Sequence, residues 1–187
     1  MASRASDHQK MITAARPFFE QLAAANDFGL DFSDDTSLIN PGNLARYQVF
    51  VMLHLAPFDM SPSQQQALQH FVETGGAWVG IHAAGLTGRQ FPAKGSNYWQ
   101  WFEDFMGGVT YSPHPKFQKA TLVVEDHKHP ATLHLPTKME VPDEWYEFDK
   151  SPRGKVRVLA SVDESSYHQN RPMGDHPIIW TNPAIAG

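Results

Sequence analysis

The first half of the chain alternates between amphipathic segments and short apolar runs. Residues 7–26 repeat with a helical period and include Pro17, which predicts a helix with a kink or a late start. Residues 30–33 are typical of a short strand, and the nearly continuous apolar run QVFVMLHL at 48–55 is typical of a buried parallel strand. The expected inner face of the helix consists of Met11, Ile12, Ala15, Phe18, Phe19 and Leu22.

A second helix and a second strand follow. Ser61 at the N-cap, Pro62 at the first helical position and Gln64 as the partner in a capping box predict the helix start. Gly75 and Gly76 end this helix, and residues 77–82 predict the next buried strand. A further helix is expected at 97–106. The predicted inward side chains are Ala67, Leu68, Phe71 and Val72 in the first of these helices and Tyr98, Trp101, Phe102 and Phe105 in the other.

This alternation of helices and strands predicts an α/β fold with a doubly wound, mostly parallel sheet. The pattern changes after the glycine pair at 107–108. Residues 121–124, 156–160 and 177–180 are typical of strands, but the long segments between them are rich in His, Pro and Asp and are expected to be functional loops. No internal repeat or linker interrupts the chain, so we expect a single domain over residues 1–187.

The predicted fold is incomplete at both ends. An α/β unit normally begins with a strand, but here no strand precedes the first helix. The chain stops shortly after the strand at 177–180, with a turn at 185–187. We therefore expect a domain truncated at both ends, lacking its first and last strands and exposing apolar edges.

Composition narrows the class of protein. The 187 residues can build one sizeable core, and 41% hydrophobic with 19% charged residues is typical of a soluble globular protein. A net charge of -5 without a basic cluster argues against a nucleic-acid partner, and neither a membrane-spanning run nor a signal peptide is present. The absence of cysteine excludes thiol catalysis, disulfides and Cys-ligated metals. The absence of cysteine is compatible with any cellular compartment, and the cytoplasm is favoured.

The stretch GGAWVGIHAAG at 75–85 places His82 where an apolar run ends in small residues. Sites in doubly wound sheets lie outside the carboxyl ends of the strands, and Ala83, Ala84 and Gly85 leave room there. Two interpretations stay open. His82 is a general base or a ligand for a polar substrate, or it is a buried histidine hydrogen-bonded to a neighbouring loop.

The segment DEWY at 143–146 combines two carboxylates with two amphipathic aromatic residues. Carboxylates accept hydrogen bonds from hydroxyls, and aromatic faces cover the apolar side of a sugar, so this segment suits a carbohydrate pocket. The alternative is a surface loop whose aromatic residues complete the core. Glu144 and Tyr146 are favoured as site members because alternate residues of an extended segment share a side.

Several other histidines are candidates. His114 lies between two prolines and His176 precedes Pro177, so each is either functional or a loop residue held by proline. His8 lies where the missing first strand would end, and His54 follows a predicted strand. Both can reach the edge of the sheet that carries His82.

The pair His127 and His129 can share a metal, although no third ligand follows from the spacing and a solvated turn is favoured. The sequence contains no Walker loop, Rossmann glycine motif, zincin motif or serine-hydrolase elbow. No nucleotide cofactor is therefore expected.

The segments GGAWVGIHAA, YSPHP, VEDHKHPAT, VPDEWYEF, LASVDESSY and MGDHPIIW have the order and spacing seen in ThuA-like (trehalose-utilisation) domains. The sequence resembles this family from about residue 4 to its end. The resemblance implies the class I glutamine amidotransferase-like fold, which has a flavodoxin-like parallel sheet. True amidotransferases carry a catalytic cysteine at the position that matches His82, so glutaminase activity is not implied.

The resemblance also implies a role in the catabolism of trehalose and related disaccharides through 3-keto sugars, alongside sugar dehydrogenases. It places the site candidates around one pocket, with His8 in the polar loop after the first strand. Our leading hypothesis is an enzyme, a hydrolase, lyase or isomerase, that acts on a disaccharide or 3-keto-sugar derivative. Its expected catalytic residues are His82 and Glu144, and its expected substrate-binding residues are His8, His114, Trp145, Tyr146 and His176.

Three alternatives remain open at this point. Several histidines and a carboxylate can instead hold a divalent metal that polarises a carbonyl or hydroxyl group. The same pocket can belong to a non-catalytic sugar-binding or accessory domain, or the chain can be a scaffold fragment without activity. The expected partner is a small carbohydrate, and a homo-oligomer is left open.

Overall fold

The computed structural model describes residues 1–89 and 97–183. The fold is mixed α/β, with one parallel and one antiparallel sheet among the described residues. The chain divides into two compact units, which are described separately below. In the described part, the first unit comprises Met1–Leu86 and residues 97–99, and the second comprises Thr87–Arg89 and residues 100–183.

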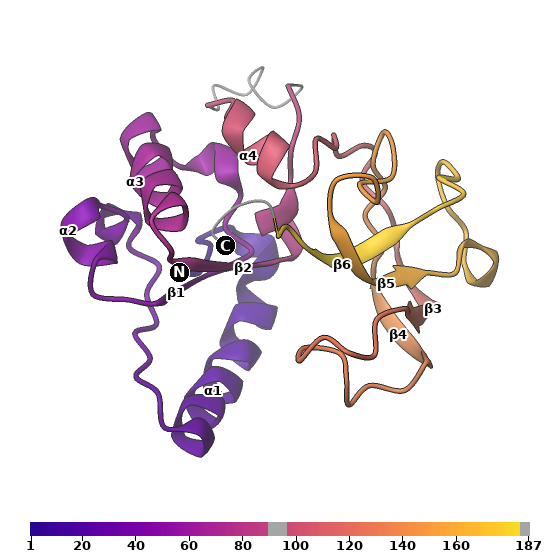
Figure 1. The fold of residues 1–187 in the computed structure, drawn as a ribbon, viewed down its shortest axis with the longest axis horizontal. Coiled ribbons are helices and arrows are strands. Elements are labelled where there is room, and N and C mark those ends of the chain that lie inside the picture. The colour runs from indigo at the N-terminus through magenta and orange to yellow at the C-terminus, as the bar shows by residue number, and fades with distance from the viewer. Residues whose placement is uncertain (90–96, 184–187) are drawn as a thin grey trace. The chain divides into compact units, whose positions relative to one another are not determined.

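The first unit is built around two parallel strands, β1 (Val49–Leu53) and β2 (Ala77–Ile81). Figure 1 shows α1 (Gln9–Asn26) and α3 (Pro62–Glu73) on opposite sides of this pair. Such a crossover, with helices on both faces of parallel strands, is the arrangement that the alternating pattern predicts. A short helix, α2 (Pro41–Leu44), precedes β1.

The predicted start of α3 is confirmed in detail. Ser61 accepts a hydrogen bond from the backbone N–H of Gln64, and the Gln64 side chain accepts one from the backbone N–H of Ser61. Gly75 follows the helix with a positive φ of 103°, a conformation that glycine adopts without strain. The helix therefore begins and ends where its capping residues predict.

Among the described residues no strand precedes α1, as expected, but the N-terminal residues do contact β1. Ala2 forms a parallel bridge with Leu53, and the backbone N–H of Ser3 donates to the Leu53 carbonyl at 3.0 Å. Residues 30–33 do not form the expected strand, although the Ser33 carbonyl accepts from Ala2. The expected turn at 185–187 lies outside the described residues.

Two burial expectations in this unit are also corrected. Strand β2 was expected to be buried, but Val79 is exposed, because within the described residues β2 pairs with β1 alone. In α1, Ile12 is buried with Leu53, whereas Met11, Phe18 and Leu22 are exposed. The apolar face of α1 in contact with the core is therefore narrower than the sequence pattern indicates.

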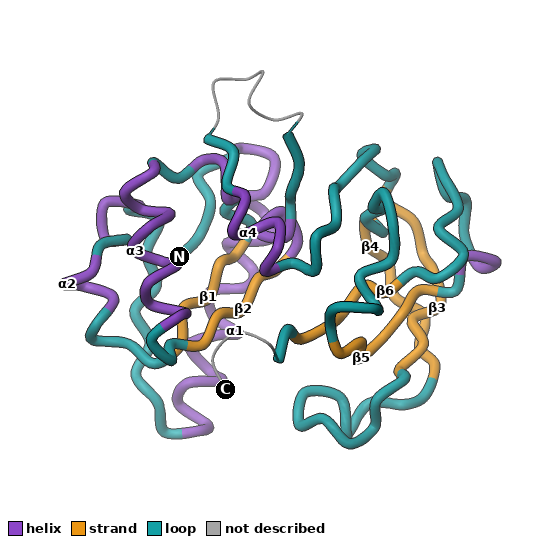
Figure 2. The backbone as a smooth tube through the Cα atoms, turned by 45° about the horizontal axis from the view of Figure 1, so that its top comes forward, coloured by secondary structure: helices purple, strands orange, loops and turns teal. Residues whose placement is uncertain are grey.

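The second unit contains the antiparallel sheet, in the strand order β4-β3-β5-β6. Figure 2 shows these strands joined mainly by long loops. The strands are β3 (Phe117–Val124), β4 (Lys138–Glu144), β5 (Arg157–Val162) and β6 (Pro177–Thr181). The expectation of a mostly parallel sheet is thus met by β1 and β2 only, and β4 was not predicted.

The residue pattern of β3 explains its antiparallel environment. Ala120, Leu122 and Val124 are buried, whereas the residues between them are more exposed. This alternation is characteristic of a strand with one face on a core and the other toward solvent, as antiparallel sheets allow. The helix expected at 97–106 is shorter, α4 (Gln100–Phe105), and the Asn97 side chain before it donates to the Met60 carbonyl.

Candidate functional site

Three histidines of the first unit meet at the carboxyl ends of its parallel strands. His54 directly follows β1, and His82 directly follows β2, where it begins the 3₁₀ turn His82–Gly85. His8 ends the 3₁₀ turn Ser6–His8 and stands at the N-cap of α1. Because parallel strands end at a common edge, the topology brings together residues that are far apart in the sequence.

The three imidazole rings contact one another. Their centroids are 4.5 Å apart for His8 and His54, 4.6 Å for His54 and His82, and 5.3 Å for His8 and His82. One nitrogen from each ring lies within 4.8 Å of the other two. We refer to these three residues as the trihistidine cluster.

The backbone is strained at two members of this cluster. His54 has a φ of 57° and His82 a φ of 58°, both in the left-handed region. Non-glycine residues there cost about 1–2 kcal/mol each and concentrate at functional sites. At His54 the conformation is held by its backbone N–H, which donates to the Ile81 carbonyl at 3.2 Å. The geometry turns both side chains out of their strands toward the same edge.

Ring nitrogens of His54 and His8 lack ordinary partners in the described part of the chain. His54 is only 5% exposed, yet within residues 1–89 and 97–183 neither of its ring nitrogens has a hydrogen-bond partner. The same holds in these residues for Nδ1 of His8, whose nearest carboxylate is that of Asp7 at 3.9 Å. A buried polar atom without a partner lowers the stability of the fold by about 1–3 kcal/mol. A ligand bound to these nitrogens would remove this cost.

Burial lowers the pKa of His54 to about 4, and the neighbouring His82 and His8 act in the same direction. The His54 ring is therefore neutral near pH 7, and the neutral imidazole is the form that binds metals. Because the nitrogens are at most 4.8 Å apart, a metal ion at the centre of the cluster would lie within about 2.8 Å of all three. A Zn–N bond is shorter, at ~2.0–2.1 Å. Small ring rotations close this difference, so the donor set fits a divalent transition metal.

A second group of candidates lies in the second unit. Nε2 of His114 is 3.4 Å from the Glu144 carboxylate, and the His114 and Tyr146 ring centroids are 6.3 Å apart. His114 is thus a neighbour of both Glu144 and Tyr146, which the sequence favours as site members. The ring centroids of Tyr111 and Tyr146 are 4.8 Å apart. Burial is the main cause that raises the pKa of Tyr111, and the charges of Glu144 and Glu147 act in the same direction.

Three expected sugar-contacting residues, Trp145, Tyr146 and His176, are buried. Trp145 is 3% exposed, lies in the hydrophobic core with Ala120 and Leu122, and donates its indole N–H to the Gln118 carbonyl. It faces the core because it continues the register of the partly buried residues Met139 and Val141 in β4. Its ring is therefore covered by protein on this side of the strand.

His176 is also buried, and its hydrogen bonds are internal. Its Nε2 donates to the Tyr146 carbonyl at 2.9 Å, and its Nδ1 lies 3.0 Å from Glu164 and 3.2 Å from the Tyr167 hydroxyl. These contacts fix the segment before β6 to the segment after β4. They give His176 a structural role that the spacing of histidine and proline does not reveal.

The sequence candidates thus fall into two groups. His8 and His82 belong to the trihistidine cluster in the first unit, together with His54. His114, Glu144 and Tyr146 form a contiguous group in the second unit. The signal that identified His54 was its position at a strand end rather than any local motif.

At the level of class, the first unit is an α/β crossover with its candidate site at the strand ends, as in many enzymes of doubly wound folds. The chain belongs to the ThuA (trehalose utilisation) family, whose model matches residues 1–187. A comparison with curated proteins gave no match.

Solved structures agree with this assignment. The chain is similar to a putative ThuA-like protein from Bacteroides uniformis ATCC 8492, with 29% identity and a TM-score of 0.85, over 98% of this chain and 76% of the other. A putative ThuA-like protein from Parabacteroides merdae ATCC 43184 has 16% identity and a TM-score of 0.67, over 97% of this chain and 72% of the other, and supports the fold alone. Within the described residues, no helix has the length and apolarity needed to cross a membrane.

Proposed function

We propose that this protein is an enzyme that acts on a disaccharide or 3-keto-sugar derivative with the help of a divalent metal held by His8, His54 and His82. Membership in the ThuA (trehalose utilisation) family supports a carbohydrate-related role. The metal rests on one observation, the approach of three histidine nitrogens to within 4.8 Å at the end of parallel strands.

The roles of the residues follow from their chemistry. The three imidazoles would hold the metal through one ring nitrogen each. A metal so held would act as a Lewis acid toward a sugar carbonyl or hydroxyl oxygen. The Asp7 carboxylate lies 3.9 Å from Nδ1 of His8, and a small movement would bring it within hydrogen-bond distance of that ring.

Glu144 is the proposed acid or base of the second unit, with His114 as its immediate neighbour at 3.4 Å. His82 and Glu144 belong to different compact units, and we propose a catalytic role for each. We also propose that β1 and β2 belong to a doubly wound parallel sheet of the family type.

Metal analysis of the purified protein tests the first half of the proposal. We expect close to one equivalent of Zn²⁺ or Mn²⁺ per chain, removable by a chelator and absent from His82→Ala. The exposed His70 on α3 provides the matched control, because His70→Ala removes a histidine from the same unit outside the cluster. No bound metal, together with no effect of chelator on activity, contradicts the proposal.

A screen of 3-keto-disaccharides and their parent sugars tests the second half. We expect turnover by the wild type that is lost in His82→Ala and in the chelated protein. If His82→Ala and the chelated protein still bind sugar, the trihistidine cluster acts in chemistry. If the wild type binds sugar but converts none of the panel, the non-catalytic sugar-binding function is favoured.

A further inference from the structure

The exposed face of β3 and β4 carries an aromatic side chain next to the candidate acid. Phe117 at the start of β3 is directly opposite Glu144 at the end of β4 in the antiparallel register. Directly opposed residues of antiparallel strands project from the same face of the sheet, with Cβ atoms about 4.5–5.5 Å apart. Phe117 and Glu144 therefore share the face that lies opposite the core residue Ala120.

Phe117 is 67% exposed, and no other large hydrophobic side chain of the described residues is exposed to a greater extent. The aromatic residues that the DEWY segment offers, Trp145 and Tyr146, are both buried, so neither presents a ring face to solvent. On this sheet face, Phe117 is the accessible ring next to Glu144.

Polar groups complete the surface. The Glu144 side chain is 26% exposed and that of His114 is 64% exposed, so both are accessible to a ligand. Nδ1 of His114 donates to the Pro115 carbonyl at 2.8 Å, which fixes the ring with Nε2 toward Glu144. A flat apolar ring beside a carboxylate and an imidazole matches a pyranose, which has an apolar C–H face and a rim of hydroxyls.

We propose that Phe117, Glu144 and His114 form a binding subsite for one pyranose ring of a sugar ligand. The ring of Phe117 stacks on the C–H face of the sugar, Glu144 accepts hydrogen bonds from its hydroxyls, and His114 contacts a neighbouring hydroxyl. This subsite rests on the proposed function only for the choice of a sugar as the ligand, and it requires no metal.

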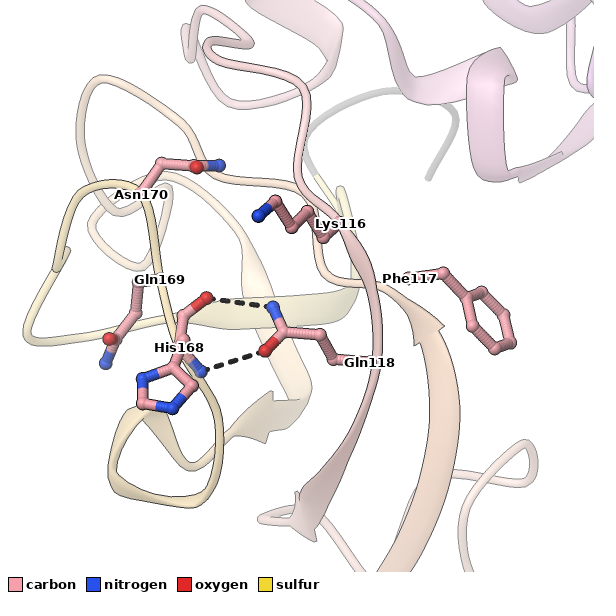
Figure 3. Close-up of a pocket in the computed structure, with 6 residues that line it drawn as sticks. All are labelled: Lys116, Phe117, Gln118, His168, Gln169 and Asn170. Carbon is pink, nitrogen blue, oxygen red and sulfur yellow. Dashed lines mark hydrogen bonds between the residues drawn. The ribbon is translucent and has the colours of Figure 1, made fainter.

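An open hollow of 440 Å³ lies beside this face and is lined by Lys116, Phe117, Gln118, His168, Gln169 and Asn170. Figure 3 shows the Phe117 ring extending away from the other five side chains, so the ring does not cover this hollow. The Gln118 amide is already engaged with the main chain of His168, through hydrogen bonds of 2.8 and 3.1 Å. The sugar is therefore assigned to the Glu144 side of β3.

Binding of trehalose and of methyl α-D-glucopyranoside, measured by calorimetry or NMR titration in the presence of a chelator, tests the subsite. We expect both sugars to bind the wild type, Phe117→Trp to retain binding, and Phe117→Ala to weaken it about tenfold through the lost stacking contact. Glu144→Gln is expected to weaken binding to a similar degree. Phe18→Ala is the matched control, because Phe18 is a similarly exposed phenylalanine, at 59%, in the other unit.

Wild-type affinity in Phe117→Ala, or no binding of either sugar to the wild type, overturns the subsite. Self-association that is lost in Phe117→Ala, without sugar binding, assigns the ring to a contact between copies of the chain and also overturns it. Failure of the metal proposal is distinguishable, because it leaves sugar binding in chelator unchanged. Since Phe117 is exposed, an unchanged thermal unfolding midpoint is expected in Phe117→Ala and excludes loss of the fold as the cause.

Discussion

At the scale of single residues, the candidate site depends on backbone conformations that the sequence pattern does not disclose. Strand ends could be located from the apolar runs, which put His54 and His82 at one edge. Their left-handed φ values of 57° and 58° could not be predicted, because they arise where each strand turns into its following segment. Trp145 shows the same limit: its residue type suits a sugar contact, but the strand register places it in the core.

The conformation of His54 leads to a test in which two variants are compared. Both His54→Gly and His54→Ala remove the buried imidazole, but only glycine adopts a φ of 57° without strain. We expect His54→Gly to be more stable than His54→Ala by about 1 kcal/mol in urea unfolding of the metal-free protein. Equal stabilities, or a more stable alanine variant, contradict the strain assigned to this position.

A second residue-scale prediction concerns Gly76, which follows α3. A Cβ atom placed there would lie 2.4 Å from the ring of Phe71, a buried side chain of that helix. We expect Gly76→Ala to lower the free energy of unfolding by about 1–3 kcal/mol, because the ring must move within a packed core. Gly154→Ala is the control, since no atom lies within 4 Å of its added Cβ, and it should change stability far less.

At the scale of elements, predictions succeeded where local chemistry decides and failed where tertiary pairing decides. The capping box of α3 is a local signal and is confirmed. Strand β4 carries Pro142 and charged residues and was not predicted, because it is specified by its pairing with β3 over seven residue pairs. A proline at position 142 is compatible with a strand here because β4 lies at an edge of the sheet, in the order β4-β3-β5-β6.

The capping box gives the first element-scale prediction. Ser61 accepts from the backbone of Gln64 at 3.3 Å, and removing its hydroxyl leaves that helical N–H without its side-chain acceptor. We expect Ser61→Ala to reduce the free energy of unfolding by about 0.5–2 kcal/mol. Ser63→Ala, two residues into the same helix turn, should have a much smaller effect in the same denaturant titration.

The second element-scale prediction concerns Glu164, which anchors the segment before β6. Burial raises the pKa of Glu164, but the backbone N–H groups of Met173 and Gly174, together with His176, outweigh it and hold the pKa below its usual range. A carboxyl with a lowered folded-state pKa stabilises the fold above its unfolded pKa, and this contribution is lost as the pH falls through the folded pKa.

We therefore expect the wild type to lose part of its stability as the pH falls below about 4.5, and Glu164→Gln to lose less over the same range. Above that range Glu164→Gln should be less stable by about 1–3 kcal/mol, because an amide cannot accept at both oxygen positions. Thermal unfolding of both proteins between neutral and acidic pH measures this. Parallel stability curves contradict the role assigned to Glu164.

At the scale of the whole molecule, the sequence predicted the α/β class and the family but not the division into two compact units. The crossover with helices on both faces could be predicted from the sequence because its helices are amphipathic and its strands apolar. The antiparallel sheet was harder to predict, because its strands are half-exposed and its loops carry many of the polar candidate residues. Each of the two units nevertheless holds one group of site candidates.

The spacing of the three histidines along the sequence makes metal binding observable at several separate segments of the first unit. The three proposed ligands come from segments that are distant in sequence, so a bound metal links the turn before α1 to the ends of β1 and β2. Since it binds the folded state, the metal stabilises these segments by up to about 4 kcal/mol at a thousandfold excess over its Kd.

We expect hydrogen exchange in Zn²⁺ to slow at peptides containing His8, His54 and His82, and this slowing to be absent in His82→Ala. Strands β3 to β6 contain none of the three histidines and provide the internal reference. The prediction fails if the three peptides do not change together, or if His82→Ala responds to Zn²⁺ as the wild type does. Joint slowing at all three is the specific signature, because a metal held at the surface by one histidine slows exchange at one segment alone.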